Sequence, residues 1–95
     1  MPEMHFRVRW PDDTVSDCYS PSLVVKEHLQ AGSHYRLADF VERSATALNI
    51  GSERVREKYG FACSSAMDQL RRIEETAARF EGQADAEVVV EAFLP

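Results

Sequence analysis

Hydrophobic and polar residues alternate strictly near the start of the chain. The apolar positions are Met4, Phe6, Val8 and Trp10, and polar residues separate them. A period of two predicts a β-strand with one buried face. Residues 11–13 (Pro-Asp-Asp) have the chemistry of a turn, so we expect residues 14–20 to form the return strand of a hairpin.

The length of the turn sets the register of this hairpin. A three-residue loop pairs Phe6 with Cys18 and places Arg7 opposite Asp17 on the outer face. A two-residue loop would bring acidic residues opposite the core positions, so we favour the longer loop. The longer loop needs a left-handed residue at its end, where Asp13 is tolerable and glycine would be better.

Apolar residues recur at intervals of three and four in two later segments, which predicts helices. The first stripe comprises Leu37, Phe40, Val41, Ala45 and Leu48. The second comprises Met67, Leu70, Ile73, Ala77 and Phe80. We expect Ser64 or Ser65 to cap the second helix, and Glu75 to pair with Arg79 on its polar side.

Glycine and serine residues predict the ends of the remaining helices. Asn49 and Gly51 indicate a break or kink, after which Ser52 can cap a separate helix over residues 52–59 that ends at a corner, Gly60.

An earlier short helix is predicted after the hairpin. Ser20 serves as its N-cap and Pro21 as its first residue, and it runs to about Gln30 and ends at Gly32. A loop over residues 32–36 follows.

The last segment, residues 88–94, is apolar on both sides apart from Glu91. Such a strand tends to be central or to lie at an interface, so we place it beside the first strand. The predicted fold is one α+β domain over residues 1–95. Its small three-stranded sheet consists of the N-terminal hairpin and the C-terminal strand, and three or four helices cover the Trp10 face.

Composition and charge narrow the classes of function. The chain has 95 residues, 44% hydrophobic and 28% charged, with a net charge of −5, which disfavours nucleic acids and anionic membranes as partners. No apolar run reaches the length of a membrane span, and no secretory signal is visible. We therefore expect a cytoplasmic protein in which both cysteines are reduced.

Few residues suggest catalysis or metal binding. Cys63 precedes a predicted helix and could be a reactive thiol, but no histidine can be assigned as its base, so a buried inert thiol is favoured. Three histidines, His5, His28 and His34, lack the spacing of metal ligands. We predict no metal, no cofactor and no catalytic residue, and we favour a non-catalytic protein over an enzyme.

Two surfaces are candidates for binding a partner. One surrounds the glycine corner and comprises Arg56, Lys58, Tyr59 and Phe61. The other is an apolar patch on the last strand, formed by Val89 and Phe93. An alternative reading of the corner is a DNA-binding helix-turn-helix with a basic patch. That patch would comprise Arg54, Arg56, Lys58, Arg71 and Arg72. A solvated helix face is favoured because the domain is acidic.

Several segments resemble a small bacterial family, the nitrogen starvation response proteins. The similar segments are residues 1–6 (Met-Pro-Glu-Met-His-Phe), 9–12 (Arg-Trp-Pro-Asp), 18–25 (Cys-Tyr-Ser-Pro-Ser-Leu-Val-Val), 38–41 (Ala-Asp-Phe-Val) and 52–64 (Ser-Glu-Arg-Val-Arg-Glu-Lys-Tyr-Gly-Phe-Ala-Cys-Ser). The resemblance is close from residue 1 to about residue 80. The family usually has glycine where Asp13 stands.

The resemblance implies a role beside other genes of nitrogen metabolism. Genes of this family lie in a cluster with a nitrilase-type carbon–nitrogen hydrolase, a radical S-adenosylmethionine protein and an acetyltransferase-like protein. It implies an accessory or binding protein for scavenging nitrogen from nitriles or cyanide, with a protein partner from the cluster or a homodimer. Two alternatives stay open: a small thiol-dependent enzyme or carrier that uses Cys63, and a DNA-binding regulator.

Overall fold

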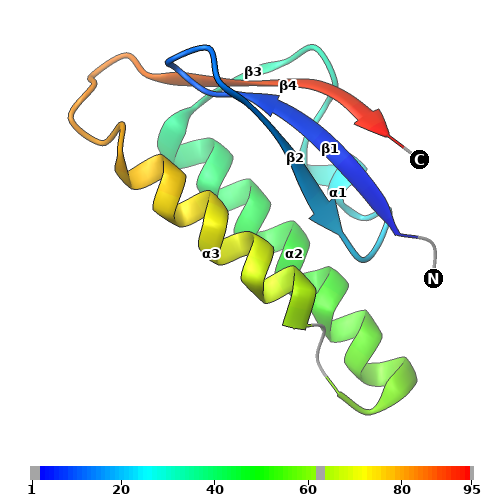
Figure 1. Ribbon diagram of the computed structural model, residues 1–95. Helices are drawn as coiled ribbons and strands as arrows, with labels where there is room; N and C mark the ends of the chain where they lie inside the picture. The colour runs from blue at the N-terminus through cyan, green and yellow to red at the C-terminus, as the bar shows by residue number, and fades with distance from the viewer. Residues whose placement is uncertain (1–2, 62–63, 95) are drawn as a thin grey trace.

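A four-stranded antiparallel sheet carries the helices on one of its faces in the computed structural model, which describes residues 3–61 and 64–94 (Figure 1). The elements in chain order are β1 (Met4–Arg9), β2 (Val15–Ser20), α1 (Val25–His28), β3 (His34–Arg36), α2 (Leu37–Tyr59), α3 (Ser64–Ala78) and β4 (Glu87–Leu94). The strand order is β2-β1-β4-β3, so β4 is central. The α+β class and the place of β4 beside β1 are confirmed, whereas the predicted count of three strands is wrong.

The N-terminal hairpin has the predicted register. Phe6 pairs with Cys18, and Arg7 lies opposite Asp17, with 3.1 Å between its Nε and the carboxylate Oδ1. The backbone N–H of Trp10 donates to the carbonyl of Thr14 at 2.8 Å, which closes the three-residue loop. Asp13 has φ of 68°, the left-handed conformation that this loop requires.

The strand that we did not predict is β3, which lies within the predicted loop over residues 32–36. His34, Tyr35 and Arg36 pair with Val89, Val88 and Glu87 of β4. The pairing continues into the preceding residues, because the N–H of Val90 donates to the carbonyl of Ser33 at 3.1 Å. Three residues are too few to show a period, so this strand depends on a distant partner rather than on local sequence.

The helix predicted from Ser20 to about Gln30 is wrong in extent, because α1 covers only Val25–His28. Ser20 is instead the last residue of β2, and its buried hydroxyl donates to the carbonyl of Ser22 at 2.7 Å. The hydroxyl of Ser22 in turn accepts from the N–H of Val24. These serines satisfy the backbone of a turn and do not cap a helix.

The break predicted at Asn49 and Gly51 is also wrong, since α2 runs without interruption from Leu37 to Tyr59. Gly51 is buried where α2 meets Pro21, and a Cβ atom at this position would lie 3.0 Å from the proline Cγ. The glycine therefore permits a close approach instead of ending a helix. The end at Gly60 is as predicted, with φ of 86° and its N–H donating to the carbonyl of Arg56.

The last helix, α3, begins at Ser64, so Ser64 and Ser65 are helical residues and not caps. The predicted ion pair between Glu75 and Arg79 is replaced by another. Glu75 accepts from Arg71 at 2.8 Å, whereas Arg79 lies 4.0 Å from the carboxylate of Asp12.

The core lies between the sheet and the α2–α3 pair. Trp10 meets the ring of Phe40 edge-on and stacks on Phe80, with ring centroids 5.6 and 6.2 Å apart. Met4, Phe6 and Val8 of β1 are buried, and so is Trp10 just after the strand, as predicted. Within the described residues, none of the helices combines the length and the hydropathy of a membrane span.

Candidate functional site

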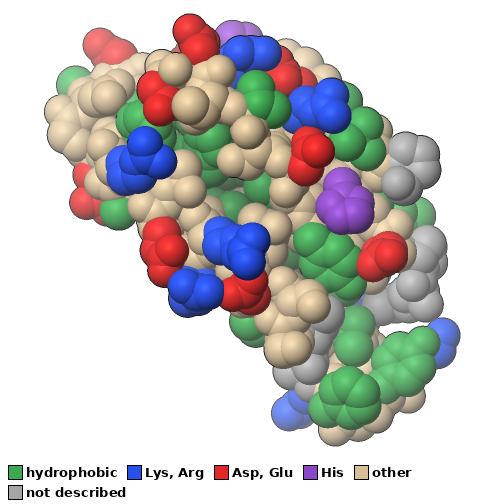
Figure 2. Space-filling view, viewed as in Figure 1, with side chains coloured by type: hydrophobic (Ala, Val, Ile, Leu, Met, Phe, Trp, Pro, Cys, Tyr) green, Lys and Arg blue, Asp and Glu red, His purple; other side chains and the backbone are tan. Residues whose placement is uncertain are grey.

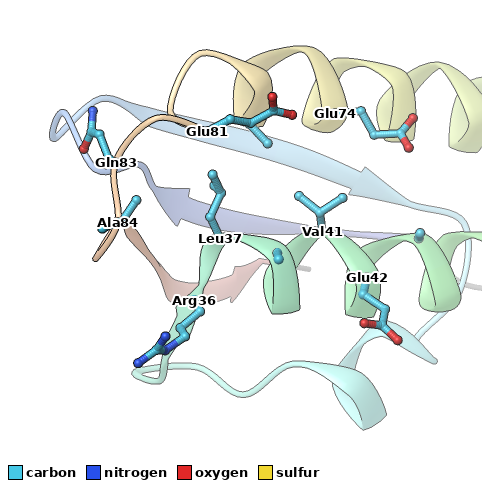
Figure 3. A pocket seen from close by; sticks show the side chains of 12 residues that line it. Arg36, Leu37, Val41, Glu42, Glu74, Glu81, Gln83 and Ala84 are labelled. Atoms are coloured by element: carbon cyan, nitrogen blue, oxygen red, sulfur yellow. The ribbon is translucent and has the colours of Figure 1, made fainter.

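A groove of about 630 Å³ opens between the start of α2, the end of α3 and the loop that leads to β4 (Figure 3). Leu37, Val41 and Ala45 project into it from α2 at intervals of four, so they lie in one row along the helix. The remaining apolar lining consists of four alanines, Ala38, Ala77, Ala84 and Ala86. The groove therefore offers an apolar floor to an occupant.

The rim of the groove is acidic. Glu42 lies on the α2 side, and Glu74 and Glu81 lie on the α3 side, with Val41 between Glu42 and Glu74 in Figure 3. None of these three carboxylates forms an ion pair with another described residue. Arg36 is the one cation among the lining residues. The groove suits an occupant with an apolar body and positive charge.

Sequence reasoning missed this groove because it treated the apolar residues of α2 as a single stripe. Phe40, Ala47 and Leu48 are fully buried, whereas Leu37 and Val41 are only half-buried. The sequence feature that could have indicated the groove is the width of the apolar stripe on α2. Leu37, Val41 and Ala45 form a row of their own, beside the row that packs on the sheet.

The residues around Gly60 project from the opposite end of the helical hairpin. Tyr59 and Phe61 are 54% and 69% exposed. Figure 2 shows hydrophobic side chains gathered at this end of the molecule, flanked by Lys and Arg side chains. The Nζ of Lys58 lies 5.5 Å from the centre of the Tyr59 ring. We call Arg56, Lys58, Tyr59 and Phe61 the tip.

The second predicted surface, Val89 with Phe93, does not lie on one face of the sheet. The register between β1 and β4 shifts between Arg7 and Val8, whose partners are Ala92 and Val90, so Glu91 is an extra residue. Phe93 lies opposite Phe6 and packs against the core, whereas Val89 lies opposite Arg9 on the outer face. A shared apolar patch is thus ruled out by geometry, and a partner-binding role for either residue stays a prediction.

The outer face of the sheet is occupied by cross-strand ion pairs. One pair joins Arg7 to Asp17, and in a second pair the Nε of Arg9 donates to the carboxylate of Glu91 at 2.8 Å. On β3, the Nδ1 of His34 lies 3.5 Å from Glu87. Charges paired in this way remain hydrated, so this face has the character of a solvated surface.

The cations of the predicted basic patch are largely engaged with neighbouring acids. Arg71 and Arg72 both pair with Asp68, and Arg56 pairs with Glu53 at 3.1 Å. Arg54 reaches the hydroxyl of Ser22 at 3.4 Å. These contacts match the interpretation as a solvated helix face, and they do not provide a continuous positive surface for a DNA backbone.

The environment of Cys18 disfavours a reactive thiol. Cys18 is free and buried on β2, and burial, assisted by the charge of Asp17, raises the pKa of its thiol to about 12. A thiol held in this protonated form is a poor nucleophile. Cys63 lies outside the described residues, so its reactivity stays a prediction.

The histidines lie apart from one another. His5 packs edge-on against Tyr19, with ring centroids 5.9 Å apart, and His28 accepts a hydrogen bond from Arg43 through its carbonyl. In the part of the chain that the structure describes, no three His, Cys, Asp or Glu side chains are grouped so as to hold a metal ion.

Comparison with known proteins links this chain to one family. A family model described as "nitrogen starvation-induced protein NitG" matches residues 5–93 of the chain. No curated protein and no solved structure gives a significant match. The matched range includes the groove, the tip and all the described strands and helices, apart from Met4 of β1 and Leu94 of β4.

Proposed function

The chain belongs to the NitG family of nitrogen starvation-induced proteins, and we propose that it acts in the nitrogen-starvation response as a non-catalytic binding protein. The observation that carries this proposal is the exposed tip. Tyr59 and Phe61 place two large aromatic side chains in solvent, beside the cations Arg56 and Lys58. Aromatic and arginine side chains are enriched among the residues that dominate protein interfaces.

The position of the tip favours protein binding over a structural role. Gly60 turns the chain in the left-handed conformation, and a Cβ atom at Gly60 would meet no atom within 4 Å. More than half of the surface of Tyr59 and of Phe61 is exposed to solvent on either side of this turn. Exposed apolar side chains that are neighbours, as Tyr59 and Phe61 are, mark interaction sites more often than scattered ones do.

The chemistry of the described residues agrees with a binding role. The buried thiol of Cys18 is protonated at neutral pH, and the paired charges on the outer sheet face are typical of a solvated surface. An apolar groove and an aromatic tip both recognise shape and charge, which requires no reacting group.

We further propose that the external partner is the nitrilase-type carbon–nitrogen hydrolase encoded beside genes of this family. In this proposal the chain assists a cytoplasmic pathway that releases nitrogen from nitriles or cyanide. The support is the family membership together with the tip, which has the composition of a protein-binding surface.

The proposal is tested by measuring the molar mass of the chain alone and mixed with the hydrolase, using light scattering. We expect a complex in the mixture, and we expect Tyr59→Ser with Phe61→Ser to weaken it by roughly 10- to 100-fold, because two buried aromatic contacts are lost. Leu23→Ser is the matched control, since Leu23 is 47% exposed elsewhere on the surface. A mixture that stays uncomplexed would remove the hydrolase as partner, and a complex insensitive to the tip variant would remove the tip.

A further inference from the structure

We propose that the groove binds the tip of a second copy of this chain, so that molecules associate head to tail. This inference goes beyond the proposed function, because it concerns the groove and needs no external partner.

The two surfaces lie at opposite ends of the molecule. The groove is built on Leu37, the first residue of α2, and the tip includes Tyr59, the last. A helix of 23 residues is about 34 Å long. The molecule measures 41 × 22 × 18 Å, and Figure 1 shows the two ends of the α2–α3 hairpin at opposite poles. The tip cannot reach the groove of its own chain, so contact between them requires a second copy.

The surfaces are complementary in both polarity and charge. Leu37, Val41 and Ala45 offer an apolar floor, and the tip offers the exposed rings of Tyr59 and Phe61. Glu42, Glu74 and Glu81 surround the floor without ion-pair partners in the described residues, and Lys58 at the tip likewise has no carboxylate partner there. Docking an aromatic ring on the floor would bring the cations of the tip to the acidic rim.

The resulting contact is heterologous, because two different surfaces meet. Such a contact leaves one groove and one tip free at the ends and extends into open chains unless the rotation closes a ring. Two aromatic side chains bury about 150–250 Å² each, well below a standard interface, so we expect weak association at concentrations on the order of 100 µM and above.

A mixing experiment tests this geometry by sedimentation velocity. The groove variant is Glu42→Lys with Glu74→Lys, which keeps the tip. The tip variant is Lys58→Glu with Phe61→Ser, which keeps the groove. We expect the wild type to show an average mass that rises with concentration, and each variant alone to bind itself at least about tenfold more weakly. The mixture is expected to form a dimer and nothing larger, because only one intact tip can meet one intact groove.

The controls separate charge and folding from docking. The charge control is Glu3→Lys with Glu27→Lys, which changes the net charge by the same amount as the groove variant does. Both control positions are exposed and lie outside the groove, so this protein should associate like the wild type. Glu42→Gln with Glu74→Gln provides a milder groove variant, which should weaken association less than the lysine pair. Circular dichroism confirms that each variant is folded.

The inference is overturned if the wild type remains monomeric up to about 1 mM. It is equally overturned if the groove variant associates as the wild type does, or if the two variants fail to bind each other when mixed. Both proposals use the tip, so binding of the hydrolase is measured separately with the groove variant, whose tip is intact. Conversely, loss of hydrolase binding with intact self-association would remove the proposed function and leave the groove assignment in place.

Discussion

Gly51 of α2 and Pro21 of the turn before α1 lie so close that a Cβ atom on the glycine would be 3.0 Å from the proline Cγ. Alanine in a helix is normally more stable than glycine by about 1 kcal/mol. We expect Gly51→Ala to show none of this gain, or a net loss, when the free energy of unfolding is measured in urea, because the added methyl group must displace a buried ring.

Two further variants show whether the contact itself is responsible. Gly82→Ala adds a methyl group where no atom lies within 4 Å, so it should leave the free energy of unfolding nearly unchanged or raise it slightly. Replacing Pro21 by alanine should restore the gain at position 51, which a double-mutant cycle measures. A Gly51→Ala protein more stable than the wild type by about 1 kcal/mol would contradict the close approach.

Ser44 is buried on α2, and its hydroxyl has no hydrogen-bond partner in the described residues. A buried polar group without a partner costs about 1–3 kcal/mol. We expect Ser44→Ala to raise the free energy of unfolding by about 1 kcal/mol, since the change removes this cost and improves helix propensity. Thermal and urea denaturation measure the effect.

Ser20 is the matched control for Ser44. It is equally buried, but its hydroxyl donates to the carbonyl of Ser22 at 2.7 Å, so Ser20→Ala should destabilise the protein by about 1 kcal/mol. If both serine variants shifted stability in the same direction, the difference in hydrogen bonding would not be the cause.

Asp13 has φ of 68°, a conformation that costs most L-residues about 1–2 kcal/mol and glycine nothing. Because the flexible unfolded chain offsets part of the benefit, we expect Asp13→Gly to stabilise the protein by roughly 0.5–1 kcal/mol. A destabilised Asp13→Gly protein, measured by urea denaturation, would count against this argument.

Replacing the neighbouring Asp12 by glycine should have the opposite effect on stability. Its carboxylate accepts hydrogen bonds from the hydroxyl and the N–H of Thr14, and the hydroxyl contact is the main cause that lowers the pKa of Asp12. Asp12→Gly removes these contacts and should destabilise the hairpin.

Cys18 predicts how stability changes at alkaline pH. Burial raises its pKa from 9.0 to about 12, so between these values the folded state retains a proton that the unfolded state has lost. The contribution of Cys18 to the free energy of unfolding is fully present below pH 9. It is lost as pH rises towards 12, with a slope of up to about 1.4 kcal/mol per pH unit. Urea denaturation at pH 8 and pH 10.5 should show a smaller pH-dependent loss for Cys18→Ala than for the wild type.

The Cys18→Ala variant leaves Cys63 as the one thiol in the chain. In the Cys18→Ala protein any alkylation reports on Cys63, and the rate against pH gives its pKa. A pKa well below that of an ordinary thiol would favour the thiol-dependent alternative over a purely binding role. In the wild type we expect Cys18 to be alkylated only after unfolding.

Local patterns in the sequence account for the elements that were predicted well. The alternation from Met4 to Trp10 and the turn chemistry at Asp13 fixed the hairpin and its register, because both depend on residues close together in the chain. The corner at Gly60 was predictable for the same reason, since a left-handed residue ends a helix without help from other elements.

Contacts between distant residues explain what was missed. Gly51 was interpreted as a helix break because its neighbour in space, Pro21, is thirty positions away in the sequence. The strand β3 exists through its pairing with Val88 and Val89, and the groove exists because α3 and the loop after it lie beside the outer row of α2. Family resemblance predicted the family correctly, but a resemblance without assigned site residues could not indicate either binding surface.

The extra residue at Glu91 makes the length of β4 adjustable at one point. Glu91 has no partner in the register with β1, so its deletion would leave Val90 opposite Val8 and Phe93 opposite Phe6, on the sides of the sheet that they occupy now. Insertion of one residue elsewhere in the strand would shift the register by one and turn every side chain beyond it to the other side of the sheet. A homologue one residue shorter at Glu91 would therefore keep the same faces of the sheet and lose only the carboxylate that pairs with Arg9.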